Sequence, residues 1–347
     1  MRAMHAVLML GLAICLVVLP ASAFQLGTGV ALPLQGQFVS PVWSPTGEGL
    51  ALAGDRFQGL YYTDLMGNLK VISDASLSGW KFSWSPDGQA LAYRMRQGDD
   101  DVAMAAMVAG MDGKVQQVSP WENDLLPPKW GKDGLTYRSG DELVTVDKDG
   151  NVKSTYSLTQ GRGLLSKIVN IFGTFMLMDV TGATFAAYGS LLSVEQAEVK
   201  PPVGVYVDSD NQLWAIDENG NRKKLLEGED EAGFNTPVES PDGDKYAVEG
   251  FGGKIYVVDK KGGLPVDLGP GSNPSWSPDG RYLIYEVTSD DGHSILSSDL
   301  WVSSVDGLER YQLTNTPGIE SWPSWSPDGK YIAYVVDGVV YIAPIQP

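Results

Sequence analysis

The chain has 347 residues, with 43 Asp and Glu against 25 Lys and Arg, which gives a formal net charge of -18 at pH 7. Phosphate backbones and anionic lipids repel such an acidic chain, so we do not expect it to bind nucleic acid or an anionic membrane surface. The length would accommodate two modest domains, but one set of repeats fills it and favours a single domain.

The first 23 residues are typical of a secretory signal peptide. Arg2 precedes an apolar run from Ala6 to Leu19, and the sequence Ala-Ser-Ala stands directly before Phe24. An apolar run of about 14 residues is short for a membrane span, which needs about 20, so we expect cleavage rather than an uncleaved anchor. Cleavage would also remove Cys15, leaving no thiol for a disulfide or for catalysis. We therefore expect a periplasmic or secreted protein.

The rest of the chain is organised by a recurring tetrapeptide, Ser-Pro-Asp-Gly. Pro presets φ, Asp can hydrogen-bond to its own backbone and Gly accepts a positive φ, so each copy predicts a tight turn between two strands. Clean copies, each directly after a Trp, stand in segments that begin at Ser83, Ser275 and Ser324, and weaker copies stand in segments that begin at Val42, Lys129 and Val238. A second, Gly-containing turn follows downstream in most units, at Asp64–Asn68, Met111–Lys114, Asp147–Asn151, Asp217–Asn221, Asp259–Gly263 and Val305–Leu308.

The two kinds of turn together define repeats of about 40 residues with four strands each, which are the blades of a β-propeller. Apolar residues on both faces of Tyr282–Val287 and Tyr331–Val336 suit blades that are covered on either side. The sequence thus predicts an all-β fold, a seven-bladed β-propeller of four-stranded blades in one domain, residues 24–347. Six blades is the alternative, if the unit around Val203 is an insertion. The seven units start near Phe38, Trp80, Pro128, Tyr188, Asn235, Asn273 and Ser321.

The last unit ends before its fourth strand. An open ring would leave exposed strand edges, so we expect Gly29–Leu34 to supply the missing strand and close the ring. The Trp residues of the clean repeats, Trp84, Trp276 and Trp325, hold equivalent places. We expect them to be buried between blades, with an exposed sugar-binding surface as the alternative.

The fourth blade, around residues 161–230, is predicted to be degenerate. Its segment Gly161–Ala187 interrupts the repeat with an apolar stretch that is too short and too polar to span a bilayer. Two interpretations stay open. The stretch is either the inner strand of this blade with a packed loop, or an inserted loop that presents Phe172, Phe175 and Met176 to a partner.

The Trp-Ser-Pro-Asp-Gly signature resembles the TolB-like propeller repeat family, also called WD40-like or PD40 repeats. The resemblance covers essentially the whole chain after the signal peptide and implies the propeller architecture, although a fold alone does not define a chemistry. TolB itself carries an α/β domain ahead of its propeller and docks a peptidoglycan-associated lipoprotein on the propeller face. Here only a short segment separates Phe24 from Phe38, so we expect a relative that is not TolB proper.

No catalytic residue is predicted. A Ser-His-Asp hydrolase needs a histidine beside its serine, and only His293 remains after cleavage, in a segment without the second Gly of a nucleophile elbow. Asp147–Asn151 and Asp208–Gln212 begin like calcium-binding EF-hand loops but lack the later Gly and Glu, so they predict hairpin tips and no metal site. No cofactor is expected either. Paired carboxylates leave a carbohydrate-active enzyme or glycan-binding propeller as the alternative function.

We expect a non-enzymatic protein-binding or scaffold module of the periplasm or cell envelope. In each blade the loop between the second and third strands carries a carboxylate, and the two longest of these loops, Gln97–Val102 and Ser289–Ser298, would form an acidic rim. Such a rim could steer a partner with a basic surface or hold a divalent cation, or it could consist only of solvated turns. The residues expected to bind are Asp99, Asp100, Asp101, Asp290, Asp291 and His293.

Overall fold

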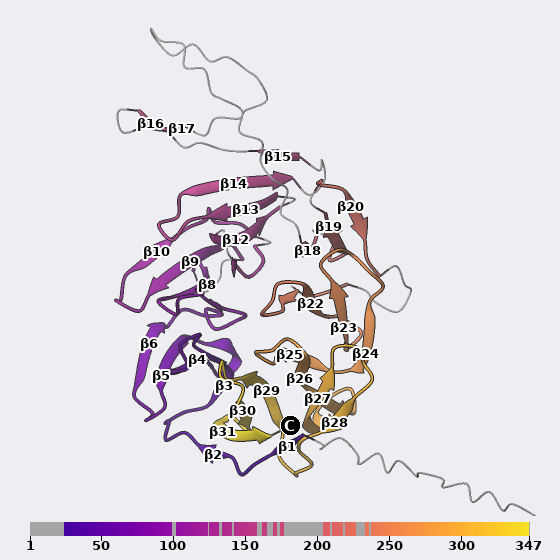
Figure 1. The fold of residues 1–347 in the computed structure, drawn as a ribbon. Coiled ribbons are helices and arrows are strands. Elements are labelled where there is room, and N and C mark those ends of the chain that lie inside the picture. The colour runs from indigo at the N-terminus through magenta and orange to yellow at the C-terminus, as the bar shows by residue number, and fades with distance from the viewer. Residues whose placement is uncertain are drawn as a thin grey trace, which may run out of the picture.

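The protein is a closed ring of seven β-sheets arranged around one axis (Figure 1). The computed structural model describes residues 24–346 except 99–101, 124, 132–133, 141, 158–161, 165–168, 172–173, 177–203, 209, 218, 227–232 and 236. Within these ranges the single helical element is a 3-10 turn, η1 (Asp55–Phe57), and no helix has the length and hydropathy of a membrane span. The predicted all-β, seven-bladed propeller is confirmed.

The first three blades follow the chain in order, each sheet running from an inner strand outward. Blade 1 is β3 (Phe38–Trp43), β4 (Gly49–Gly54), β5 (Leu60–Asp64) and β6 (Leu69–Ser73). Blade 2 is β7 (Ser83–Trp84), β8 (Ala90–Arg96), β9 (Met104–Gly110) and β10 (Val115–Gln117). Blade 3 is β11 (Lys129–Gly131), β12 (Gly134–Ser139), β13 (Glu142–Val146), β14 (Val152–Ser157) and a fifth strand, β15 (Arg162–Leu164).

The remaining blades complete the circle. Blade 4 contains β18 (Gly204–Val207), β19 (Leu213–Ile216) and β20 (Arg222–Lys224), and blade 5 contains β21 (Val238–Glu239), β22 (Lys245–Glu249), β23 (Lys254–Asp259) and β24 (Val266–Pro270). Blade 6 contains β25 (Ser272–Trp276), β26 (Tyr282–Asp290), β27 (Ile295–Ser304) and β28 (Arg310–Gln312). Blade 7 contains β29 (Glu320–Trp325), β30 (Tyr331–Val336) and β31 (Val339–Gln346), joined by β1 (Gln25–Leu26) and β2 (Val30–Ala31).

The repeated tetrapeptide forms the turn between the first and second strands, as its residues predict. In blade 7 the Ser326 hydroxyl donates to Asp328 at 2.7 Å and accepts the backbone N–H of Tyr331, while Gly329 takes a φ of +74°. The same serine–aspartate bond occurs in blades 2, 5 and 6. The predicted turn at Val305–Leu308, between the third and fourth strands of blade 6, has the same kind of bond, from the Ser304 hydroxyl to Asp306.

The tryptophans of the clean repeats are buried between neighbouring blades, as predicted. Trp84, Trp276 and Trp325 are each 8% exposed. The indole N–H of Trp84 donates to the Val42 carbonyl in the preceding blade, and Trp276 donates to Val238 in the same way. Each bond satisfies a buried indole and fixes one blade against the next.

The ring closes through the N-terminal segment, as predicted from the unpaired last blade. β2 pairs antiparallel with β31, and the backbone N–H of Leu32 continues this pairing to the Val340 carbonyl at 2.9 Å. β1 also pairs with β31, further along the same strand. That second pairing was not predicted from the sequence.

The segment after blade 3 is divided among several elements. β15 extends blade 3, whereas β16 (Val169–Ile171) and β17 (Thr174–Met176) pair with each other in a hairpin. Among the described strands, neither joins the β18–β20 sheet. Residues 169–171 and 174–176 thus pair with each other, and the rest of the stretch up to Ala187 lies outside the described residues. The predicted start of the fourth unit, Tyr188, lies outside the described residues.

Candidate functional site

The candidate site lies at the end of the ring where second strands lead to third strands and where one blade leads to the next. With the four strands of a blade lettered a to d from the axis outward, we call this the b–c end. The first strands of blades 1, 6 and 7 have a β-bulge near this end. At or near these bulges, and at the corresponding place in blade 2, residues other than glycine take a left-handed backbone: Ser40, Lys81, Asn273 and Trp322, with φ of 50° to 55°. Bulges re-aim side chains, and such backbone outliers concentrate at functional sites.

A buried glutamate occupies the acidic side of this site. Glu286 is 8% exposed although it stands within the apolar strand β26. Its carboxylate accepts hydrogen bonds from the Asn273 amide at 2.9 Å, the Ser272 hydroxyl at 3.2 Å and the backbone N–H of Trp322 at 2.6 Å. Burial raises the pKa of Glu286 to about 7, while these donors oppose the rise and the nearby Glu249 carboxylate adds to it.

Three cations from blades 2 and 3 occupy the basic side. Burial, together with the nearby charge of Lys81, lowers the pKa of Lys129 to about 8. Burial also lowers the pKa of Lys81, partly offset by its attraction to Glu249 and reinforced by Arg94. The Arg94 guanidinium donates to the Leu125 carbonyl at 2.6 Å, and burial lowers its pKa to about 10. Among the described residues these cations have no ion pair within 4 Å.

Aromatic rings stand between the two charged sides. Phe57, at the end of η1, makes edge-on contacts with Trp80 at 4.6 Å and with Trp322 at 5.5 Å between ring centroids. The Lys81 ammonium lies 5.5 Å from the centroid of the Trp80 ring. Blades 1, 2 and 7 therefore meet through these rings. We call the whole set the axial cluster: Phe57, Trp80, Lys81, Arg94, Lys129, Glu249, Asn273, Glu286 and Trp322.

The axial cluster can bind but has few features of a catalyst. Asn273 contacts both carboxylates, since its backbone N–H donates to Glu249 at 3.4 Å and its side chain donates to Glu286. Both oxygens of Glu286 are engaged by donors from the protein, so neither is free to protonate a leaving group. No group of three or more metal-ligating side chains occurs in the described part of the chain.

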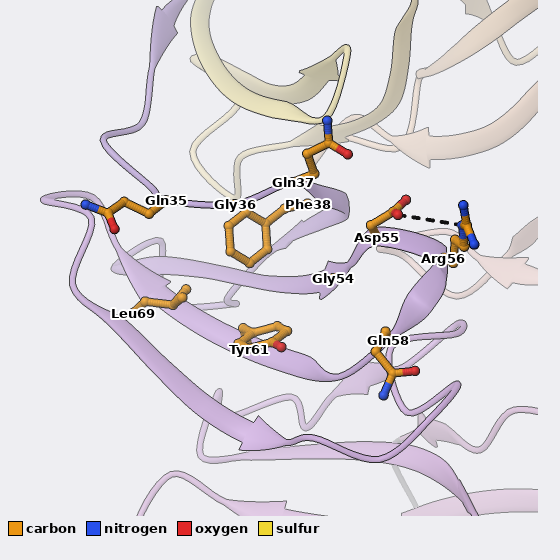
Figure 2. A pocket seen from close by; sticks show the side chains of 10 residues that line it. All are labelled: Gln35, Gly36, Gln37, Phe38, Gly54, Asp55, Arg56, Gln58, Tyr61 and Leu69. Atoms are coloured by element: carbon orange, nitrogen blue, oxygen red, sulfur yellow. Dashed lines mark ion pairs between the residues drawn. The ribbon is translucent and has the colours of Figure 1, made fainter. Parts of the chain in front are cut away.

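A shallow cleft of about 560 Å³ lies beside the axial cluster on blade 1 (Figure 2). It is lined by the linker residues before β3 and by the turn after β4. Phe38 and Tyr61 meet edge-on inside it, with ring centroids 5.5 Å apart. Asp55 pairs with Arg56 at 3.7 Å on its rim, where both side chains are mostly exposed. The cleft and the axial cluster share η1, because Phe57 follows Arg56.

The predicted rim residues that the structure describes serve their own turn. Asp290 accepts the backbone N–H of Gly292, and Asp291 accepts those of His293 and Ser294, which lowers the pKa of Asp291. Their role in binding stays a prediction. Asp99, Asp100, Asp101 and Phe172 lie outside the described residues, and of Phe175 and Met176 only the backbone strand β17 is described. Of the predicted binding residues, Asp290, Asp291 and His293 lie together in one described turn.

Two loops that resemble EF-hand starts are hairpin tips, as predicted. Asp147 accepts the backbone N–H groups of Asp149 and Asn151 at 2.9 Å, and Asp208 does the same for Asp210 and Gln212. These carboxylates hold the turn closed.

The axial cluster was missed because its members share no motif and come from distant parts of the chain. A usable signal existed in the strands, however. Glu286 interrupts an apolar run, as do Arg94 and Arg96, and a charge inside a strand covered on both faces needs an explanation. Asn273 and Trp322 each precede a proline two residues before the blade tryptophan, which marks the bulge.

The fold and this site define a seven-bladed β-propeller with a charged and aromatic cluster at one end of its axis. No protein-family model and no curated protein matches the chain. The crystal structure of TolB from Acinetobacter baumannii is similar with a TM-score of 0.49 and 18% identity, covering 84% of this chain and 57% of that chain. The structure of a putative TolB from Agrobacterium tumefaciens is similar with a TM-score of 0.47 and 16% identity, covering 90% and 91%. The chain thus spans little more than half of the first protein, and no function is transferred from either.

Proposed function

We propose that the protein is an exported, non-enzymatic propeller that binds a protein partner at the b–c end, over the axial cluster. The observation that carries this proposal is the convergence of charged and aromatic side chains from several blades on one place. Hydrogen bonds from Ser272, Asn273 and Trp322 hold Glu286 in position before any ligand arrives. Preorganised polar groups beside aromatic surface are typical of binding sites.

Exposed apolar side chains on the surrounding loops support a protein as the ligand. Ile295 and Leu296 are 52% and 62% exposed where β27 begins at the b–c end, and Phe251 in the corresponding turn of blade 5 is 51% exposed. Aromatic and aliphatic residues around a polar centre are the usual components of a protein interface. Export to the periplasm or the outside of the cell rests on the signal-like residues 1–23.

The competing function is a carbohydrate-active enzyme that uses Glu249 and Glu286. One observation favours it: the two carboxylates share Asn273, and burial raises the pKa of Glu286 to about 7. A carboxyl group with a raised pKa beside a second carboxylate is a feature of acid–base catalysis. The engagement of both Glu286 oxygens argues against it. Release of reducing ends from a glycan panel, lost in Glu249→Gln, would establish the enzyme.

Site-specific photocrosslinking tests the binding function. A photoreactive amino acid at Arg56, exposed at the b–c end, should form an adduct with an envelope protein in intact cells. The matched position is Gln89, exposed in the turn between first and second strands of blade 2, at the opposite end. We expect an adduct at Arg56 and none at Gln89. Adducts only at Gln89, or at neither position, would contradict the proposal.

A further inference from the structure

The basic side of the axial cluster is an uncompensated group of positive charges within an acidic protein. The Ser83 hydroxyl donates to the Pro128 carbonyl at 2.9 Å, which brings the chain next to Lys81 against the chain next to Lys129. The charge of Lys81 lowers the pKa of Lys129, and the charge of Arg94 lowers the pKa of Lys81. All three are only partly exposed. Bringing like charges together away from water raises the free energy of the unliganded protein.

The compensation that the protein itself supplies is incomplete. Glu249 attracts Lys81 but forms no ion pair with it within 4 Å, and its Oε2 accepts the Asn273 backbone N–H. Glu286 directs its oxygens toward blades 6 and 7. The Nε of Arg94 is buried and has no hydrogen-bond partner among the described residues. A buried donor without an acceptor costs free energy, so the protein itself satisfies this guanidinium only in part.

We propose that Lys81, Arg94 and Lys129 bind the carboxylate of an acidic side chain in a peptide segment of the partner. This inference rests on the proposed function and specifies its ligand. A carboxylate offers several acceptor positions, and its charge would relieve the mutual repulsion of the lysines. Phe57, Trp80 and Trp322 line the adjoining space with apolar surface. The segment should therefore carry apolar or aromatic residues next to its acidic one.

The test uses two blocked peptides, Gly-Phe-Glu-Phe-Gly and Gly-Phe-Gln-Phe-Gly, titrated by calorimetry against the purified full-length protein. They have nearly the same shape and differ in the charge of one side chain. We expect the Glu peptide to bind about tenfold more tightly than the Gln peptide. A third peptide, Gly-Phe-Phe with a free C-terminal carboxylate, separates a terminal carboxylate from a side-chain one. Tighter binding of that peptide than of the Glu peptide would overturn the assignment to a side chain.

Variants locate the charge that discriminates. Lys81→Gln and Lys129→Gln should each abolish most of the preference for Glu over Gln, while Lys129→Arg should keep it. Lys114→Gln is the control, because Lys114 is exposed between third and fourth strands at the opposite end of the ring. Thermal unfolding of each variant verifies that it folds. A preference that survives in the double variant, equal binding of both peptides, or binding of neither overturns the proposal.

Failure here is distinguishable from failure of the proposed function. If the adduct at Arg56 forms but persists in the variant lacking both lysine charges, the partner binds at the b–c end without a carboxylate in this site. If no adduct forms at all, the b–c end is not the binding surface.

Discussion

One aspartate in a turn shows how a single side chain determines local structure. The Ser326 hydroxyl and the Lys330 backbone N–H both donate to Asp328, and the serine bond is the main cause of its lowered pKa. A side chain that closes its own turn has little freedom to contact a partner. In the axial cluster, by contrast, Lys81 and Lys129 form no ion pair within 4 Å among the described residues. Abundant carboxylates in turns therefore indicate folding, and rare charges in inner strands indicate function.

The blade tryptophans make a testable contribution to stability. Trp276→Ala should lower the free energy of unfolding by about 3 to 5 kcal/mol, because it removes a buried ring and its hydrogen bond to Val238. Trp276→Phe should lower the free energy of unfolding by less, because it keeps most of the buried apolar surface. The remaining loss comes from the Val238 carbonyl, which no longer has its donor. Urea denaturation measures both. An unchanged free energy of unfolding in Trp276→Ala would contradict the expectation.

Glu286 should make stability depend on pH. Its pKa in the folded protein is about 7, against 4.5 when unperturbed. Between these values the folded state holds a proton that the unfolded state has released, so stability falls as pH rises through this window. The full effect is about 3 kcal/mol. Chemical denaturation from pH 5 to pH 8 measures it.

Glu286→Gln should flatten this pH profile, because the glutamine side chain does not titrate. The matched control is Glu48→Gln, because Glu48 is exposed in the turn between the first two strands of blade 1. That control should keep the wild-type profile. A slope that is unchanged in Glu286→Gln would assign the pH dependence to other groups.

At the scale of elements, the decisive strand pairing joins the two ends of the described chain. β1 and β2 cover the edge of β31, which would otherwise expose unpaired backbone groups. Deleting residues 24–36 should therefore cause aggregation or lower the free energy of unfolding by several kcal/mol, because the pairing and packing of about one strand are lost. Thermal unfolding and light scattering measure the two outcomes. Unchanged stability would show that the closure contributes nothing.

A point substitution tests the same closure without a truncation. A Cβ on Gly29 would approach the Tyr334 hydroxyl and the Tyr341 ring, which are packed against each other under the N-terminal segment. Gly29→Ala should thus push this segment off β31 and lower the melting temperature. Gly98→Ala is the control, since a Cβ there meets no atom within 4 Å. Equal melting temperatures for the two variants would contradict the role of Gly29.

The sequence predicted those elements whose cause is local. The turns follow from serine, proline, aspartate and glycine within a few residues. The strand at Gly29–Leu34 followed from counting the strands of the last unit, which ends before its fourth strand. The axial cluster depends instead on how blades 2 and 5 face each other across the axis, since Lys81 and Glu249 are far apart in the chain but close in space. The hairpin of β16 and β17 has no repeat signal, so its pairing could not be assigned. The β1 pairing follows from the length of β31, which has 8 residues against 6 in β29 and 6 in β30.

The whole molecule combines a net charge of -18 with a basic group at one end of its axis. Around that group, exposed acidic loops include Asp55, Asp290 and Asp291. A partner that suits this arrangement carries an acidic tip surrounded by a basic surface. Such a charge pattern selects one orientation and accelerates association more than it strengthens the final complex.

The rim and the centre should consequently affect different rate constants of partner binding. Asp290→Asn with Asp291→Asn should slow association and weaken its salt dependence, because these charges are exposed and screened by salt. Lys81→Gln with Lys129→Gln should mainly speed dissociation at every ionic strength, because the partly buried contact is screened less. Surface plasmon resonance with the purified partner that photocrosslinking identifies, at low and high salt, separates the two effects. If the aspartate variant matches the wild type in both rate constants and in salt dependence, the rim consists only of solvated turns, and the axial cluster alone selects the partner.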